Sequence, residues 1–150
     1  MAHSLSFVLV HVIFSTKDRR PVLDASVRPK LYAYMATVVR NLKCECYHAG
    51  GVADHVHLAI RLSRTMNLAE LVETLKTSSS KWLKTQSSEL TRFAWQLGYG
   101  AFSVGPAQVD DLVGYINRQE AHHEKVSFQD ELRAFLRKYG MEPDEQYLDD

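Results

Sequence analysis

HVHLAIRL, residues 55–62, is the stretch that decides the fold. Side chains alternate between the two faces of a β-strand, so four aliphatic residues share one face: Val56, Leu58, Ile60 and Leu62. The other face carries His55, His57, Ala59 and Arg61. Because the aliphatic face must pack on a core, the two imidazoles stand side by side on the opposite face. Their separation suits two ligands of one divalent ion.

The segments on either side predict an α+β fold. Hydrophobic residues repeat with helical or strand periodicity in an order of strand, helix, strand, strand, helix, strand, followed by two more helices. The expected elements are a strand at 6–14, a helix from between Asp24 and Pro29 to Lys43, strands at 44–49 and 55–62, a helix capped by Asn67 and ending near Ser87, one bent or two short strands within 93–104, and helices at 108–122 and 128–139. This order predicts a ferredoxin-like (RRM-like) antiparallel sheet with helices on one face plus C-terminal helices.

The composition predicts a single domain over residues 1–150. A chain of 150 residues with 45% hydrophobic content can bury one core, and the acidic stretch 140–150 is expected to form a flexible tail. There is no apolar run of about 18 residues and no secretory signal pattern, so we expect no membrane partner. Cys44 and Cys46 are the only cysteines and lack bridging geometry, which favours a reducing, cytoplasmic location.

The zero net charge conceals an uneven distribution. Residues 1–92 hold 13 basic and 7 acidic side chains, whereas residues 93–150 hold 5 and 11. A basic portion of this kind can bind phosphate by releasing counterions, although solvated surfaces would give the same composition.

The predicted helix 108–122 offers a nucleophile. Its packing stripe consists of Val109, Leu112, Val113 and Ile116. At about 100° per residue, Tyr115 lies off this stripe, and Gln119 lies one turn later on the same side. A phenol and an amide oxygen therefore project together.

These residue types suit phosphodiester cleavage. A metal ion held by His55 and His57 would neutralise the phosphate, and the Tyr115 oxygen would attack phosphorus. A free phenol has a pKa near 10, so a local cation or base must assist its ionisation.

Four motifs resemble a known family. ADHVHL (53–58), GYGAFSV (98–104), YINRQEAHH (115–123) and FQDEL (128–132) occur in the order and spacing of the single-tyrosine transposases of bacterial insertion sequences. These belong to the HUH endonuclease superfamily, and the chain also resembles transposases associated with repetitive extragenic palindromes (REP). The resemblance runs from about Val10, through Thr16–Pro21, to the end of the last helix.

The resemblance implies both an activity and a site. It implies a transposase that cleaves and rejoins single-stranded DNA bearing hairpins, through a 5′-phosphotyrosine on Tyr115 and a free 3′ hydroxyl. It implies Mg²⁺ or Mn²⁺ as cofactor, with His55, His57 and Gln119 as ligands. It also implies a homodimer in which the tyrosine helix of one subunit can complete the histidine site of the other.

Basic side chains supply candidate DNA contacts. Lys17, Arg19 and Arg20 cluster in one turn, where three cations repel each other unless an anion is near. Arg61 follows the histidines along the strand, and Lys76 and Lys81 lie on a polar helix face.

Simpler readings of the same residues stay open. The two histidines can be exposed strand residues, Tyr115 a packing residue, Gln119 a surface amide, and the basic side chains solvated. His122 and His123 could add a metal ligand, contact phosphate or lie solvated at a helix end, where a partly charged imidazole suits the helix dipole, and the helix-end reading is favoured.

Two other functions compete with transposition. A ferredoxin-like sheet can bind RNA or single-stranded DNA without cleaving it. A host-domesticated HUH nuclease acting on chromosomal palindromes would share the same chemistry. The sequence does not identify the DNA hairpin or the cleavage site.

Overall fold

The computed structural model describes residues 4–142 and has the predicted α+β architecture. Six elements form the ferredoxin-like unit: β1 (Val8–Ser15), α1 (Arg28–Asn41), β2 (Glu45–Gly51), β3 (His55–Leu62), α2 (Leu68–Leu83) and β4 (Gly100–Val104). The strands pair in the order β2-β3-β1-β4, and every neighbouring pair is antiparallel. The fold class predicted from the sequence is therefore confirmed.

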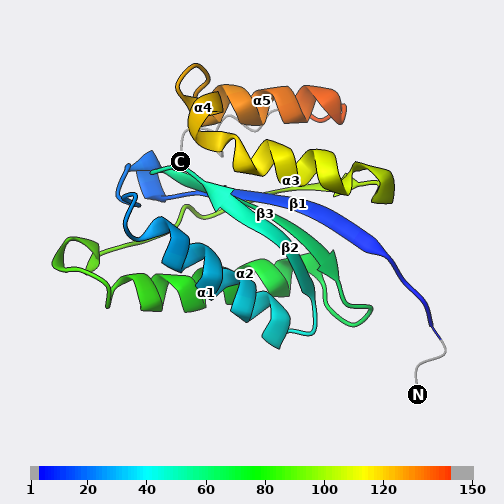
Figure 1. The fold of residues 1–150 in the computed structure, drawn as a ribbon, viewed down its shortest axis with the longest axis horizontal. Coiled ribbons are helices and arrows are strands. Elements are labelled where there is room, and N and C mark those ends of the chain that lie inside the picture. Colours follow the sequence, from blue (N-terminus) through cyan, green and yellow to red (C-terminus); the bar gives the residue numbers. More distant parts are fainter. Residues whose placement is uncertain (1–3, 143–150) are drawn as a thin grey trace.

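The aliphatic face of β3 packs in the main core, as its alternation predicts. Val56, Leu58 and Ile60 are fully buried there, together with β1 residues such as Val12 and Phe14. Helices α1 and α2 cover this face of the sheet (Figure 1). Asn67 caps α2 as expected, because its side-chain oxygen accepts a hydrogen bond from the backbone N–H of Glu70 at 2.8 Å.

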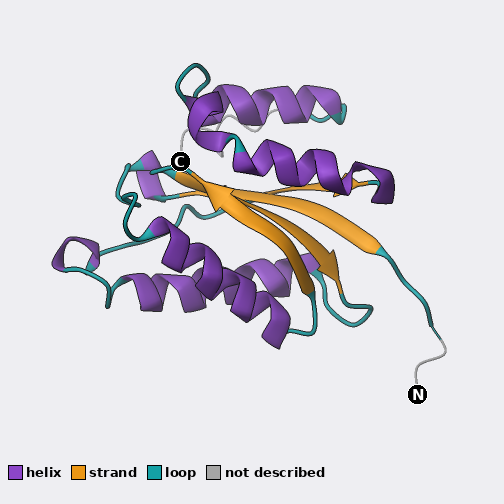
Figure 2. Ribbon diagram, in the orientation of Figure 1, coloured by secondary structure: helices purple, strands orange, loops and turns teal. Residues whose placement is uncertain are grey.

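A second helical layer covers the face that holds the histidines. It consists of α3 (Val109–Asn117), α4 (Gln119–His123) and α5 (Phe128–Lys138), so the sheet lies between two layers of helices (Figures 1 and 2). Helix α3 approaches β2 closely, since a Cβ atom on Gly50 would lie 2.7 Å from Ile116 Cγ2. His55 and His57 are consequently fully buried rather than on an open polar face.

Three predicted elements differ in extent from the observed ones. The helix expected at 108–122 is divided near Arg118, where the Tyr115 carbonyl accepts from the Arg118 N–H at 3.2 Å and from the Gln119 side chain at 3.4 Å. Helix α2 ends at Leu83 because the next turn closes with shorter-range bonds from Thr85 to Trp82 and from Gln86 to Leu83. Within 93–104, only β4 and one bridge between Trp95 and Thr16 are extended pairings, and Leu97 is 83% exposed.

Short 3-10 helices complete the described chain: η1 (Lys17–Arg19), η2 (Ser88–Leu90) and η3 (Pro106–Gln108). None of the helices within residues 4–142 has both the length and the apolar character needed to cross a bilayer. From residue 143 onward, the predicted acidic tail lies outside the described residues.

Candidate active site

His55 and His57 direct the same ring nitrogen toward one buried point. The Nδ1 atom of His55 lies 2.7 Å from Asp54 Oδ1, and the Nδ1 atom of His57 lies 2.8 Å from His11 Nε2. In both residues the Nε2 atom therefore faces the space between the sheet and α5. The strand alternation predicted this pairing of imidazoles, and the register of β1 against β3 brings His11 to the same face.

The carboxylate of Glu131 on α5 occupies that point. Its Oε1 atom lies 3.1 Å from His57 Nε2, 3.1 Å from His123 Nε2 and 3.5 Å from His55 Nε2. Its Oε2 atom lies 3.3 Å from His122 Nε2. Glu131 is 3% exposed, so the surrounding imidazoles compensate a carboxylate that has left water. We refer to His55, His57, His123 and Glu131 as the His–Glu cluster.

Tyr115 and Gln119 reach this cluster from the neighbouring helices. The Tyr115 hydroxyl donates a hydrogen bond to Glu131 Oε2. The Gln119 Oε1 atom lies 3.4 Å from His55 Nε2, and the Gln119 side chain is 1% exposed. All four residues singled out as catalytic or metal-binding in the sequence thus meet within one chain.

Burial and charge set the protonation of the cluster. Burial acts against ionisation of Glu131, but hydrogen bonds from His123 and His55, together with the close contact of His57, hold the pKa of Glu131 well below its usual range. Burial also opposes the charged form of His55, yet the hydrogen bond to Asp54 and then the bond to Glu131 raise the pKa of His55. The cluster therefore contains an ionised carboxylate beside a His55 that favours its charged form.

His57, His11 and Tyr115 stay uncharged. Burial lowers the pKa of His57 to about 4 and also lowers the pKa of His11. Burial, and then the adjacent Glu131 carboxylate, raise the pKa of Tyr115 far above its ordinary value. In the absence of an added cation, Tyr115 is a protonated phenol.

The donor set fits a divalent metal ion. One ligand atom from each member of the His–Glu cluster lies within 4.8 Å of the others. The buried His57 Nε2 atom has no hydrogen-bond partner among the described residues, although it lies 3.1 Å from Glu131 Oε1. An unsatisfied ring nitrogen pointing at a carboxylate and two further imidazoles is the arrangement that a shared cation would satisfy.

Sequence reasoning missed Glu131 and His11 and preferred a helix-end reading for His123, yet the structure brings all three residues to this site. Glu131 lies within the motif FQDEL, and that membership was the only signal available for it. His123 does end α4, but its side chain is mostly buried there and packs against His55 with ring centroids 4.3 Å apart. His11 lies within an apolar strand segment, where a single buried histidine carries no periodic signature.

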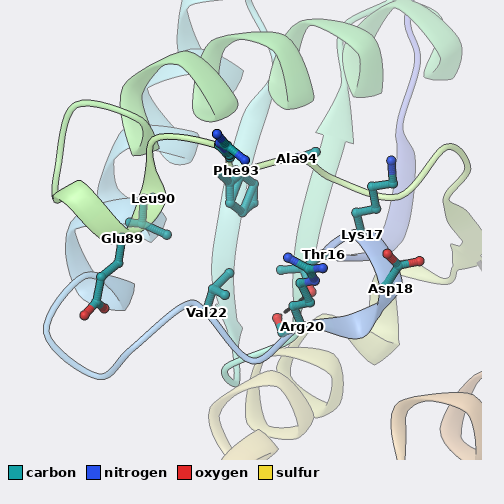
Figure 3. Close-up of a pocket in the computed structure, with 10 residues that line it drawn as sticks. Thr16, Lys17, Asp18, Arg20, Val22, Glu89, Leu90, Phe93 and Ala94 are labelled. Carbon is teal, nitrogen blue, oxygen red and sulfur yellow. Dashed lines mark hydrogen bonds between the residues drawn. The ribbon is translucent and has the colours of Figure 1, made fainter.

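The predicted basic turn lies at the same end of the sheet as the His–Glu cluster. Thr16 donates its backbone N–H to the Asp54 carbonyl at 2.9 Å, and Asp54 is the partner of His55. Lys17 and Arg20 line a hollow of about 310 Å³ and lie across it from Glu89 and Leu90 on η2 (Figure 3). Arg19 faces a separate hollow of about 450 Å³ that His123 and Asp54 also line. The turn therefore divides its cations between two depressions beside the site.

The other three predicted DNA contacts lie elsewhere. Arg61 stacks over the Phe7 ring at 4.4 Å and donates to the Ser6 carbonyl, near the opposite end of β3 from His55. Lys76 donates to the carbonyl oxygens of Gln96 and Gly98 at 2.8 and 2.5 Å, and burial lowers its pKa to about 8. Lys81 is exposed on α2, in the helical layer opposite the site.

Comparisons with known proteins identify the family of this chain. The model of the IS200-like transposase family matches residues 4–119, which is more than half of the chain. The chain therefore belongs to the IS200-like transposase family. No curated protein matched the sequence.

Two solved structures have similar folds. One is the 1.90 Å crystal structure of a protein proposed to be a transposase from Deinococcus radiodurans, with a TM-score of 0.63, 19% identity, and coverage of 79% of this chain and 95% of that chain. The other is a REP-associated tyrosine transposase bound to a REP hairpin, with a TM-score of 0.60, 14% identity, and coverage of 84% and 76%. At these identities the similarity establishes the fold.

The uncharged state of His57 predicts an acid-dependent loss of stability. An unfolded histidine titrates near pH 6.5, whereas the folded His57 resists protonation until about pH 4. Between these values the unfolded chain binds a proton that the folded chain does not, so stability falls as the pH drops through this window. With EDTA present, urea unfolding should show the wild type losing about 3 kcal/mol more than His57→Gln from pH 6.5 to 4. Parallel pH profiles for the two proteins would contradict a neutral, buried His57.

Proposed function

We propose that this protein cleaves and rejoins single-stranded DNA through a covalent bond between Tyr115 and a 5′ phosphate, with a divalent ion held at the His–Glu cluster. Membership of the IS200-like transposase family supports the general activity. The finer assignment rests on one observation. The Tyr115 hydroxyl and the Nε2 atoms of His55 and His57 all meet the same Glu131 carboxylate.

That shared contact puts nucleophile and cation ligands within reach of a single phosphate. A phosphate has several oxygens around one phosphorus, so one oxygen can face the imidazole side while the phenol faces phosphorus. In the proposed step, the Tyr115 oxygen forms a bond to phosphorus and the bond from phosphorus to the 3′ oxygen breaks. The phenol proton leaves Tyr115, and the departing 3′ oxygen takes up a proton to become a hydroxyl. Reversal by the same or another 3′ hydroxyl rejoins the strand.

His55 and His57 are the proposed primary ligands of the ion. Gln119 contributes its amide oxygen, as the family resemblance implies, and the geometry adds His123 and Glu131 as donors. Of the two expected metals, the imidazole-rich donor set favours Mn²⁺ over Mg²⁺, which prefers oxygen ligands. When bound, the ion would neutralise charge on the phosphate and favour the ionised form of a nearby phenol.

Lys17, Arg19 and Arg20 are the proposed contacts to the DNA backbone. Within residues 4–142, Lys17 and Arg20 form no ion pair, and the hollow they line has an apolar floor that includes Val22 and Phe93. Single-stranded DNA with one phosphate at the His–Glu cluster would run past this turn. The hairpin-bound state of the REP-associated transposase supports a hairpin-bearing strand as substrate.

A homodimer remains part of the proposal, but it is not needed to assemble this site. Tyr115 contacts the cluster of its own chain. If two subunits exchanged their tyrosine helices, the contact of Tyr115 with Glu131 of its own chain would therefore be replaced by the same contact between subunits.

Tyr115→Phe should abolish the covalent adduct because it removes the attacking oxygen while keeping the ring. The assay incubates the protein and Mn²⁺ with hairpin-bearing single strands and separates the products on a denaturing gel. A label on the 3′ side of the cut should migrate with the protein, and a label on the 5′ side should appear on a shorter strand with a free 3′ hydroxyl.

Tyr34→Phe is the matched control because Tyr34 stacks on Trp82 at 5.1 Å, in the helical layer on the other face of the sheet. It should form the adduct at the wild-type level. Adduct formation by Tyr115→Phe would reject Tyr115 as nucleophile. A wild-type protein that shifts the DNA without any adduct would favour a non-catalytic binding module.

Lys17→Ala and Arg20→Ala should each weaken single-strand binding and its dependence on salt. Each lost phosphate contact should reduce the slope of log affinity against log salt by about 0.7. Fluorescence anisotropy of a labelled single strand over a salt series measures both quantities. Arg40→Ala, in the last turn of α1, serves as the control, and equal slopes in all four proteins would exclude this turn from the DNA path.

A further inference from the structure

His11 makes a contact that the proposed chemistry does not use. It lies on β1, is 2% exposed, and its Nε2 atom is 2.8 Å from the Nδ1 atom of the fully buried His57. The two rings are nearly parallel, with an interplanar angle of 25° and centroids 5.0 Å apart, so they meet edge to edge through these nitrogens. The Phe135 ring meets His11 edge-on at 5.1 Å, and the Tyr115 ring does so at 6.1 Å. The orientation of His11 is therefore fixed from both sides.

Because of the way imidazole forms hydrogen bonds, this contact bears on which nitrogen of His57 carries the proton. A neutral imidazole carries one N–H, and the nitrogen that binds a metal must be the other, unprotonated one. The tautomer is set by whichever group accepts the N–H. For His57, Nε2 lies 3.1 Å from Glu131 Oε1 without making a hydrogen bond among the described residues, whereas Nδ1 lies 2.8 Å from His11 Nε2.

We propose that His11 is a positioning residue that accepts the Nδ1–H of His57 and so keeps the His57 Nε2 lone pair directed at the ion. This assignment rests on the proposed metal function of the cluster. In this arrangement the proton of neutral His11 resides on its own Nδ1, and both rings remain uncharged.

The environment explains why an imidazole fills this role. His55 has a carboxylate partner, Asp54, whose side chain is 29% exposed and can remain hydrated. The corresponding position beside His57 is enclosed between the sheet and α5, where an unpaired carboxylate would carry a large desolvation cost. A neutral imidazole offers an acceptor without a second buried negative charge close to Glu131. The two histidine ligands are thus oriented by chemically different partners.

The test compares two substitutions of His11. His11→Phe keeps an aromatic ring against Phe135 but removes the acceptor, so the His57 proton should move to Nε2 and block that nitrogen. Titration calorimetry with Mn²⁺ alone, without DNA, should show affinity reduced by about 10- to 100-fold. His11→Gln restores an acceptor oxygen near the position of Nε2 and should recover most of that affinity.

A spectroscopic readout separates positioning from packing. The ¹⁵N imidazole shifts of His57 in the ion-free protein should show a protonated Nδ1 in the wild type and in His11→Gln, and a protonated Nε2 in His11→Phe. Wild-type Mn²⁺ affinity in His11→Phe would overturn the proposal. Equal losses in both variants, with native near-UV circular dichroism, would also overturn it by assigning His11 to packing.

The two hypotheses can fail separately. Absence of Mn²⁺ binding by the wild type would refute the metal centre of the proposed function. The His57 tautomer in the ion-free wild type and in His11→Phe would still decide whether His11 sets the protonation of its neighbour.

Discussion

The buried carboxylate of Glu131 is the interaction on which this site depends. A carboxylate that is 3% exposed requires compensation, and it receives hydrogen bonds or close contacts from His55, His57 and His123 as well as from the Tyr115 hydroxyl. These groups come from β3, α3, α4 and α5, so one charge ties the C-terminal helices to the sheet. An uncompensated charge of this kind would cost several kcal/mol, which makes separation of the layers unfavourable.

The same interaction explains why the histidine face of the sheet is closed. In a ferredoxin-like unit, α1 and α2 cover one face and leave the other available. Here Ile13 and Ala59, on the histidine face, pack against the C-terminal helices beside the polar cluster. Apolar contacts thus surround a small ionic centre and exclude water from it. A cation entering this centre would meet ligands that protein packing already holds in place.

The strand and helix periodicities predicted the fold and part of the site. Alternation along 55–62 indicated that His55 and His57 share a face, and helical spacing indicated that Tyr115 and Gln119 project together. Both inferences are local, because they need only the geometry of one element. Glu131, His123 and His11 could not be found in this way, since their roles depend on how α4, α5 and β1 pack across the sheet.

The basic residues show the same limit. The helical spacing of Lys76 predicted a position on a solvated helix face. In the structure the segment at 96–98 passes over Lys76, and the Lys76 ammonium donates hydrogen bonds to two carbonyl oxygens of that segment. Arg61 shares a strand face with the histidines, yet the N-terminal segment covers it through Phe7 and Ser6. In both cases an irregular segment covers the basic side chain. Such segments have no periodic sequence pattern from which their position could be predicted. The cations of the turn at Lys17–Arg20 were predicted from their clustering, whereas the position of this turn beside the His–Glu cluster comes from the structure.

The most direct test of the central claim is the anomalous scattering of crystals soaked in Mn²⁺. The account predicts one strong peak bonded to the Nε2 atoms of His55 and His57, with Glu131 displaced from its present position or bound as a ligand and the Tyr115 oxygen beside it. A peak elsewhere on the protein, or none at a concentration that supports strand cleavage, would contradict a metal centre at the His–Glu cluster.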